Sequence, residues 1–316
     1  MNNSFTVHQL IQHLEYEIIN ESHRTESIHI YTSEFNRPGL QLSGFYTSFV
    51  PGRIQIIGGA EWQYLYTLEP EVRRSRIEKL FAQRIPLLIV TRGQEIFPET
   101  VELAREYHIT ILRTPKTTTK VVNELITYME TALAPTIRRH GILMDIYGVG
   151  VLITGESGIG KSETALDLIV NGHKLISDDS VIIKKIDDRL IGTSPPVTRH
   201  FMEIRGIGII DIQRLFGVGA VMEQKEIEFI IHLTHWVEGQ EYDHLGMLDD
   251  FEIIMGRQVK KAEIPLRPGR NTAVIMEIAT QNFKQKEMGY NPAEVLNQRI
   301  MEAIRINREK EFNQKP

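Results

Sequence analysis

Cysteine is absent from this chain of 316 residues. Without cysteine the protein has no disulfide bond, no thiolate metal site and no cysteine nucleophile, which is compatible with a reducing cytosol. No stretch approaches the roughly 18 consecutive apolar residues that a membrane-spanning helix requires. Residues 1–5 lack the basic region and apolar core of a signal peptide. We therefore expect a cytoplasmic protein that binds no membrane.

The chain also lacks a large excess of charge of either sign, with 36 basic and 41 acidic residues and a formal net charge of -5 at pH 7. This balance argues against a general binder of nucleic acid or of acidic membranes. The chain is long for one hydrophobic core. We predict two domains, residues 1–133 and 134–316, because a helix should end before Pro135.

Hydrophobic periodicity in the first domain alternates between the spacing of helices and that of strands. This alternation predicts an α/β fold with a mostly parallel sheet covered by helices. No group of residues in this half suggests catalysis, so we expect it to serve regulation or assembly. The expected helices are residues 7–19, 60–82, 99–107 and 119–133, and the expected strands are 27–33, 53–58, 86–91 and 109–112.

The second domain opens with two apolar runs, residues 142–147 and 149–154, separated by Gly148. A G-x-x-x-x-G-K-S segment follows them directly, and an apolar helical pattern follows that segment. Backbone N–H groups of such a loop surround phosphate oxygens, the lysine adds a positive charge, and the serine hydroxyl ligates Mg²⁺. The residues expected to bind nucleotide phosphates are Gly155, Glu156, Ser157, Gly158, Ile159, Gly160, Lys161 and Ser162.

The runs before this loop predict a tight hairpin. Most doubly wound nucleotide-binding folds reach their phosphate loop from a parallel strand. The hairpin therefore indicates a different nucleotide-binding architecture. Further strands are expected at residues 228–233 and 252–255, and Asn291 is expected to cap a helix that has Pro292 in its first turn.

Two adjacent acids, Asp178 and Asp179, stand at the end of an expected strand. Side chains of neighbouring strand residues face opposite ways, so only a loop conformation would bring both to the nucleotide. Phosphoryl transfer to a hydroxyl requires a carboxylate near the acceptor oxygen. A solvated acidic turn is the alternative. Glu203 precedes a segment that carries Arg205 and several glycines, which together could supply a metal-binding carboxylate, a guanidinium and backbone amides.

Three further residues are weaker candidates. Arg267 and Arg270 lie in a stiff loop that is suited to gripping phosphate oxygens, although a surface turn is an equal alternative. His140 could orient or protonate a phosphate, although a lone histidine is usually structural.

The final helix carries an apolar stripe made of Val295, Leu296, Ile300, Met301 and Ile304. We expect this stripe to pack within its own domain or between subunits. Partner binding is the less favoured interpretation.

Taken together, His140-Gly141, the phosphate loop, Asp178-Asp179 and residues 202–210 and 265–271 resemble the HPr kinase/phosphorylase family in order and spacing. The resemblance implies phosphorylation of a serine on the carrier protein HPr, with ATP or pyrophosphate as donor and Mg²⁺ as cofactor. It also implies reversal by inorganic phosphate to give pyrophosphate, control of carbon metabolism, a homohexamer, and a P-loop kinase domain similar to phosphoenolpyruvate carboxykinase.

The resemblance also assigns roles. Lys161 would bind the β and γ phosphates, and Ser162 and Glu203 would hold Mg²⁺. Asp179, rather than Asp178, would take the serine proton and return it in the reverse reaction. The remaining assignments place His140 at the transferred phosphate and Arg267 and Arg270 in a loop needed chiefly for dephosphorylation.

Two positions depart from the family pattern. His244 stands where the family has arginine in a Tyr-Asp-Arg-x-Gly segment, and Asp211 stands where asparagine is usual. Histidine is shorter than arginine and largely neutral near pH 7. His244 therefore leaves one alternative, a nucleotide-responsive regulator that has lost catalysis. A kinase of small molecules is a second alternative, because the phosphate chemistry by itself does not name the acceptor.

Overall fold

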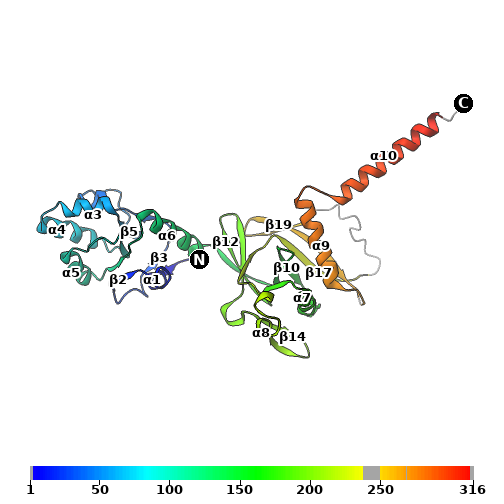
Figure 1. Ribbon diagram of the computed structural model, residues 1–316, viewed down its shortest axis with the longest axis horizontal. Coiled ribbons are helices and arrows are strands. Elements are labelled where there is room, and N and C mark those ends of the chain that lie inside the picture. Colours follow the sequence, from blue (N-terminus) through cyan, green and yellow to red (C-terminus); the bar gives the residue numbers. More distant parts are fainter. Residues whose placement is uncertain (1–2, 238–249, 268, 314–316) are drawn as a thin grey trace. The chain divides into compact units, whose positions relative to one another are not determined.

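The computed structural model describes residues 3–237, 250–267 and 269–313. The chain folds into two compact units, an N-terminal unit, Met1–Pro135, and a C-terminal unit, Thr136–Pro316. Both units combine sheets with helices (Figure 1). Among the described residues, no helix has both the length and the apolar character needed to span a membrane.

The N-terminal unit alternates strands and helices along the chain, as its periodicity predicts. Its helices are α1 (Val7–Leu14), α2 (Gly39–Leu42), α3 (Gly59–Tyr66), α4 (Pro70–Phe81), α5 (Pro98–Glu106) and α6 (Thr118–Leu133). Its strands are β1 (Phe5–Thr6), β2 (Glu17–Asn20), β3 (His29–Ile30), β4 (Phe35–Asn36), β5 (Ile54–Ile57), β6 (Leu87–Val90) and β7 (Thr110–Arg113).

The main sheet of this unit has the strand order β2-β7-β6-β5-β4. The pairs β4-β5, β5-β6 and β6-β7 are parallel, and β2 pairs with β7 in the antiparallel direction. The prediction of a mostly parallel α/β sheet is therefore confirmed. The expected helix over residues 7–19 is too long, because Glu15 adopts a left-handed φ of 51° and ends α1. Ile18 then pairs with Leu112 in the sheet.

Alternate residues of the central strands face two separate cores. Ile54, Ile56 and Ile89 face a core that α1 and α6 complete, while Leu88 and Val90 face a core that α4 and α5 complete. This two-sided burial explains why the strands read as continuous apolar runs.

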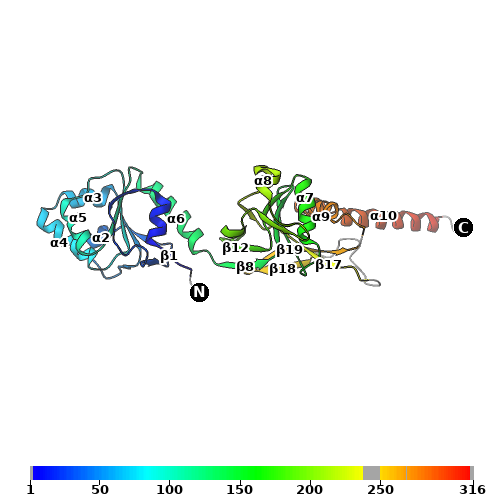
Figure 2. The same cartoon turned by 90° about the horizontal axis from the view of Figure 1, so that it is seen from below.

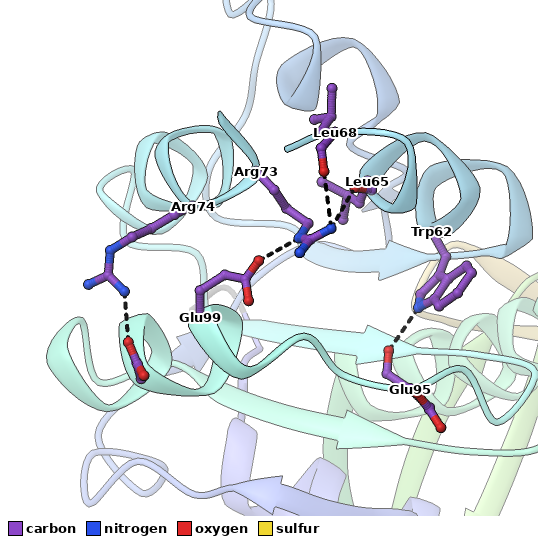
Figure 3. A network of polar contacts seen from close by, with 8 residues as sticks. Trp62, Leu65, Leu68, Arg73, Arg74, Glu95 and Glu99 are labelled. Atoms are coloured by element: carbon purple, nitrogen blue, oxygen red, sulfur yellow. Dashed lines mark hydrogen bonds and ion pairs between the residues drawn. The ribbon is translucent and has the colours of Figure 1, made fainter. Parts of the chain in front are cut away.

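Polar contacts connect the helices over the second core. Figure 3 shows Arg73 of α4 reaching Glu99 of α5, with Nε and Oε1 2.5 Å apart, and Trp62 of α3 donating to the carbonyl of Glu95. Arg73 also lies over the ring of Phe97, 4.0 Å from its centroid. Since Arg73 and Glu99 are only 11% and 14% exposed, this pair links the two helices where water is largely excluded.

The C-terminal unit is built mainly of strands. Its helices are α7 (Lys161–Val170), α8 (Ile212–Phe216), α9 (Thr272–Glu287) and α10 (Pro292–Asn313), with short 3-10 helices at Pro196–Thr198 and Val218–Ala220. Its strands are β8 (Thr136–His140), β9 (Ile142–Ile146), β10 (Val149–Gly155), β11 (Lys174–Ser177), β12 (Ser180–Ile186), β13 (Arg189–Thr193), β14 (Phe201–Ile204), β15 (Gly208–Asp211), β16 (Gln224–Glu226), β17 (Phe229–His235), β18 (Asp250–Ile254) and β19 (Arg257–Leu266).

A six-stranded mixed sheet, in the order β11-β9-β10-β17-β19-β18, forms the centre of this unit. Strands β9 and β10 make the expected antiparallel hairpin, which turns at Tyr147 and Gly148 with φ of 53° and 84°. Strands β10, β17 and β19 are parallel neighbours. Their carboxyl ends therefore lie along one edge of the sheet, where ligands of α/β proteins usually bind.

Helices cover one face of this sheet and a second sheet covers the other. Figure 2 shows α7 and α9 on the same side of the strands, where their side chains join one core. The four-stranded sheet β16-β13-β12-β8 packs on the opposite face through a second core. These layers hold the start of α7 against the carboxyl edge of the sheet.

The last helix leaves most of its apolar stripe accessible. Asn291 accepts a hydrogen bond from the backbone N–H of Ala293 at 3.1 Å, as expected for a residue that precedes the helix. Leu296, Ile300, Met301 and Ile304 are 43–61% exposed. Packing within its own domain, one of the two expected settings for the stripe, therefore does not bury these four side chains.

Candidate active site

The phosphate loop joins the carboxyl end of β10 to the amino end of α7, in the arrangement that the sequence predicts. Gly155 has a φ of 144°, and a Cβ there would lie 2.6 Å from the carbonyl oxygen of Leu233. Only glycine accepts both that conformation and that contact. Gly160, with a φ of 105°, caps α7 without a side chain. The first backbone N–H groups of α7 are thus directed toward the loop, which favours an anion.

Lys161 places its ammonium group at this loop. Its Nζ donates to the carbonyl oxygens of Gly155 at 2.9 Å and Glu156 at 2.8 Å. The residue is only 8% exposed, so the charge lies where water screens it weakly. A positive charge held beside the amide groups suits a polyphosphate.

A pocket with a volume of about 200 Å³ opens in front of Lys161. Nine of the expected site residues line it together with Ile142, Glu163 and Arg205: His140, Ser157, Gly158, Gly160, Lys161, Ser162, Asp178, Asp179 and Glu203. Residues more than sixty positions apart in the chain thus meet at one pocket.

The two adjacent aspartates occupy the turn between β11 and β12. Asp179 has a left-handed φ of 62°, and this conformation allows both side chains to line the pocket. Asp178 is 8% exposed and accepts hydrogen bonds from the backbone N–H of Glu203 at 3.1 Å and from Ser162 Oγ at 3.5 Å. The exposed carboxylate of Asp179 lies 3.1 Å from Nδ1 of His140.

Burial raises the pKa of Asp178 above its ordinary value. Hydrogen bonds from the backbone N–H groups of Glu203 and Asp179 and from Ser162 act in the opposite direction, and the charge of Asp179 raises the pKa further. Desolvation, which disfavours the charged carboxylate, is the largest of these effects. The two acids thus differ in environment, one buried and hydrogen-bonded, the other open to the pocket.

The raised pKa of Asp178 predicts how the stability of the protein depends on pH. The folded chain holds a proton on Asp178 more tightly than the unfolded chain, so stability from this group is lost as pH rises above the ordinary aspartate value of 3.8 through the folded pKa. The melting temperature of the wild type relative to Asp178→Asn should therefore fall as the pH rises above about 4. Thermal unfolding of both proteins measures this difference, and a constant difference would contradict the prediction.

The oxygen atoms around Ser162 fit a magnesium ion. Mg²⁺ prefers carboxylate, hydroxyl, water and phosphate oxygens, and Ser162, Asp178 and Glu203 bring a hydroxyl and two carboxylates to the pocket. No cluster of three or more histidine or acidic side chains in the described part of the chain could hold a metal by itself. The donor set therefore suits a metal that also binds the phosphates of a nucleotide.

Arg205 contributes the guanidinium that the sequence suggested beside Glu203, although no catalytic role was assigned to it. A Cβ at Gly158 would lie 2.8 Å from its Nη2, so the glycine lets the guanidinium lie against the phosphate loop. The sequence signal for Arg205 as a site residue was its position two residues after Glu203. Because β14 and β15 form a two-stranded sheet, that short segment delivers both side chains to the pocket.

The other expected residues lie elsewhere. Ile159 is 8% exposed and packs in the core beneath the loop, whereas the exposed Glu156 lies 3.8 Å from His235. Arg267 and Arg270, both described, follow β19 at the same edge of the sheet and do not line the pocket. His244 lies outside the described residues.

Asp211, the second departure from the family pattern, has a clear local role. Its Oδ1 accepts a hydrogen bond from the backbone N–H of Arg214 at 3.0 Å and caps α8. Asparagine and aspartate are comparable helix caps. The substitution therefore preserves the start of this helix.

The hairpin-fed phosphate loop, its lysine and the acidic residues around one pocket define a P-loop phosphotransferase. The sequence profile of the HPr serine kinase C-terminal domain matches residues 131–300, and that of the HPr serine kinase N terminus matches residues 5–129. The chain belongs to the HPr serine kinase/phosphorylase family.

Similar proteins include an HPr kinase/phosphorylase of Clostridium perfringens, 46% identical over 300 residues that cover 95% of this chain and 97% of the relative. That of a Thermoanaerobacter species is 48% identical over 299 residues, covering 94% and 98%. A solved structure of the Hpr(Ser) kinase/phosphatase from Coxiella burnetii is 41% identical and covers 49% of this chain and 94% of that one, with a TM-score of 0.47.

Proposed function

We propose that this protein is a bifunctional serine kinase/phosphorylase of HPr that contributes to the control of carbon metabolism. It would phosphorylate HPr with ATP or pyrophosphate and remove the phosphoryl group by phosphorolysis. The observation that carries the proposal is the meeting of Lys161, Asp179 and Glu203 at one pocket, in a chain that matches this family over residues 5–129 and 131–300.

In the kinase direction, the loop N–H groups and Lys161 bind the β and γ phosphates of the donor. Ser162 and Glu203 would hold Mg²⁺, and Mg²⁺ neutralises charge on the phosphates when bound. Asp179 accepts the proton of the HPr serine hydroxyl, since its carboxylate is exposed to the pocket. Asp178 is less suited to this role because its oxygens already accept hydrogen bonds from Glu203 and Ser162.

In the reverse direction, an oxygen of inorganic phosphate attacks the phosphorus of phosphoserine. The bond between phosphorus and the serine oxygen breaks, and the protonated Asp179 returns a proton to that oxygen, giving serine and pyrophosphate. His140, 3.1 Å from Asp179, would orient this carboxyl group and contact the transferred phosphoryl group. Arg267 and Arg270 would grip the attacking phosphate, because guanidinium groups match its oxygens.

The decisive experiment measures both reactions with purified protein, Mg²⁺ and a cognate HPr. Labelled ATP should yield phosphoserine on HPr, and inorganic phosphate added to phosphorylated HPr should release pyrophosphate. Absence of both reactions would reject the function. Transfer to small-molecule acceptors in place of HPr would support a small-molecule kinase.

His244 motivates a separate prediction, because the family pattern has arginine at its position. If the imidazolium of His244 replaces that guanidinium, kinase activity should rise as the pH falls toward about 6.5, the ordinary pKa of histidine. His244→Arg should then be more active than the wild type, by about tenfold at pH 8 and less at pH 6. Rates across this pH range test the idea, and matching profiles for the two proteins would contradict it.

His244 also supports a second class of function, a nucleotide-responsive regulator. A regulator that has lost catalysis would bind nucleotide without turnover, and His244→Arg would restore activity to it. Nucleotide titration of the wild type, followed by the HPr assay of both proteins, separates this function from a working kinase.

We also propose a cytoplasmic homohexamer in which the N-terminal unit serves assembly or regulation. The apolar stripe of α10 supports an assembly because four of its side chains remain 43–61% exposed in the single chain. Light scattering after size-exclusion chromatography measures the mass, and a monomer at micromolar concentration would reject the hexamer.

A further inference from the structure

Trp236 lies beside the loop that carries Arg267 and Arg270. It follows β17 directly, and its backbone N–H donates to the carbonyl of Leu266 at 3.2 Å. This bond extends the parallel pairing of β17 with β19 by one residue beyond the pair His235 and Leu266. The chain after β17 and the chain after β19 are therefore held together where Trp236 and Arg267 begin.

The indole ring of Trp236 brings two guanidinium groups close to each other. The guanidinium carbon of Arg267 lies 5.5 Å from the ring centroid, and that of Arg270 lies 5.9 Å from it. Both distances are within the range of cation–π attraction. Like charges gathered at one ring repel each other, and an oxyanion between them would offset that repulsion. A guanidinium that contacts a ring through its face keeps its in-plane N–H donors for such an anion.

The backbone restrains the second arginine as well. Asn271 follows Arg270 directly and accepts a hydrogen bond from the N–H of Val274 at 3.2 Å, capping α9. The loop therefore runs from the paired end of β19 to a capped helix. Both arginines are exposed, and with the two ends of the loop fixed, Trp236 can decide where the guanidinium groups lie.

The location fits a phosphate-handling role. Strands β10 and β17 are parallel, with Gly155 opposite Leu233, so the phosphate loop and Trp236 leave the same edge of the sheet. Nε2 of His235, the residue before Trp236, lies 3.8 Å from the carboxylate of Glu156 in the phosphate loop. The indole is thus at the same end of the sheet as Lys161 while remaining outside the pocket lining.

We propose that Trp236 is a positioning residue that gathers Arg267 and Arg270 into the binding site for the free oxyanion substrate, inorganic phosphate or pyrophosphate. This proposal rests on the proposed function for its effect on turnover. Anion binding itself requires neither HPr nor a nucleotide. The anion site and the proposed function can therefore be rejected independently of each other.

The kinetic test compares Trp236→Leu, Trp236→Phe and the wild type in both directions. Trp236→Leu should raise the KM for phosphate in phosphorolysis by about tenfold, through loss of two cation–π contacts. The kinase kcat and the KM for ATP should stay within about twofold of the wild type, because Trp236 does not line the pocket at Lys161. Trp236→Phe keeps an aromatic face and should recover most of the phosphate affinity.

Three outcomes would overturn the proposal. An equal rise in the KM for ATP would show that the indole serves the nucleotide, and a rise confined to the KM for HPr would show that it serves the protein substrate. An unchanged KM for phosphate in Trp236→Leu would show that the arginines are positioned without it.

A binding test needs no turnover. The chain contains two tryptophans, so Trp62→Phe in the N-terminal unit leaves Trp236 as the sole indole emitter. Titration of this variant with inorganic phosphate or pyrophosphate should change the indole emission, and adding Arg267→Ala and Arg270→Ala should abolish the change. A response that survives the double arginine replacement, or no response in the parent variant, would overturn the site even if HPr turnover is normal.

Discussion

Replacing Lys161 by alanine is expected to lower phosphoryl transfer from ATP to HPr by about a thousandfold. The ammonium group of Lys161 lies in a weakly hydrated site at the start of α7, held by the carbonyls of Gly155 and Glu156. No neighbouring cation in the loop itself can take its place, since the other seven residues of the loop carry no positive charge. Transfer of label from ATP to HPr measures the loss.

The control for this variant is Lys120→Ala. Lys120 also lies in the first turn of a helix, α6, but it is exposed and belongs to the N-terminal unit. It should retain wild-type activity. Because Lys161 also bonds two loop carbonyls, the melting temperature of Lys161→Ala must be measured. Retention of more than about a tenth of the activity in a folded Lys161→Ala protein would contradict its role at the phosphates.

Asp179→Asn is expected to lower both the kinase and the phosphorylase rates by about a thousandfold, within the usual range for a lost general base. The amide keeps the shape of the side chain but neither accepts the serine proton nor returns it. Because Asp179 is proposed to serve both directions, the two rates should fall together. Affinity for ATP should change little, since that binding is proposed to come from Lys161 and the loop amides. Single-turnover rates and nucleotide titration measure the two effects separately.

A matched control exists for Asp179 in the turn between β12 and β13. Asp187 is also an exposed aspartate with a left-handed φ, 52° against 62° for Asp179. Asparagine tolerates this conformation as well as aspartate does. Asp187→Asn should therefore leave both rates unchanged. If Asp178→Asn abolished the proton transfer and Asp179→Asn did not, the assignment of the base would have to be reversed.

Local sequence signals predicted much of the fold because the strongest of them report burial. The strand runs at residues 86–91 and 149–154 correspond to β6 and β10, whose side chains are buried on both faces. The helix over residues 7–19 was predicted too long because Ile18 continues the helical spacing by chance. Its pairing with Leu112, more than ninety residues away, decides its conformation, and periodicity cannot detect such a partner.

The chemistry of the phosphate loop is encoded in adjacent residues, so its glycines, lysine and serine were identified together. The distinction between Asp178 and Asp179 was not encoded in this way. It depends on the left-handed φ of Asp179 and on hydrogen bonds that Asp178 accepts from Glu203 and Ser162. Trp236 gave no sequence signal, because its relation to Arg267 and Arg270 arises only from the pairing of β17 with β19.

The sequence by itself determined the alternation of helices and strands, the phosphate loop and the family, because each of these is written in residues that are close along the chain or in a fixed order. The tertiary structure alone decided which of the two adjacent acids is buried and which arginine lies against the phosphate loop. It also decided which aromatic ring lies close to both Arg267 and Arg270. Those properties depend on desolvation and on contacts between distant segments, and they exist only once the layers of the C-terminal unit have packed.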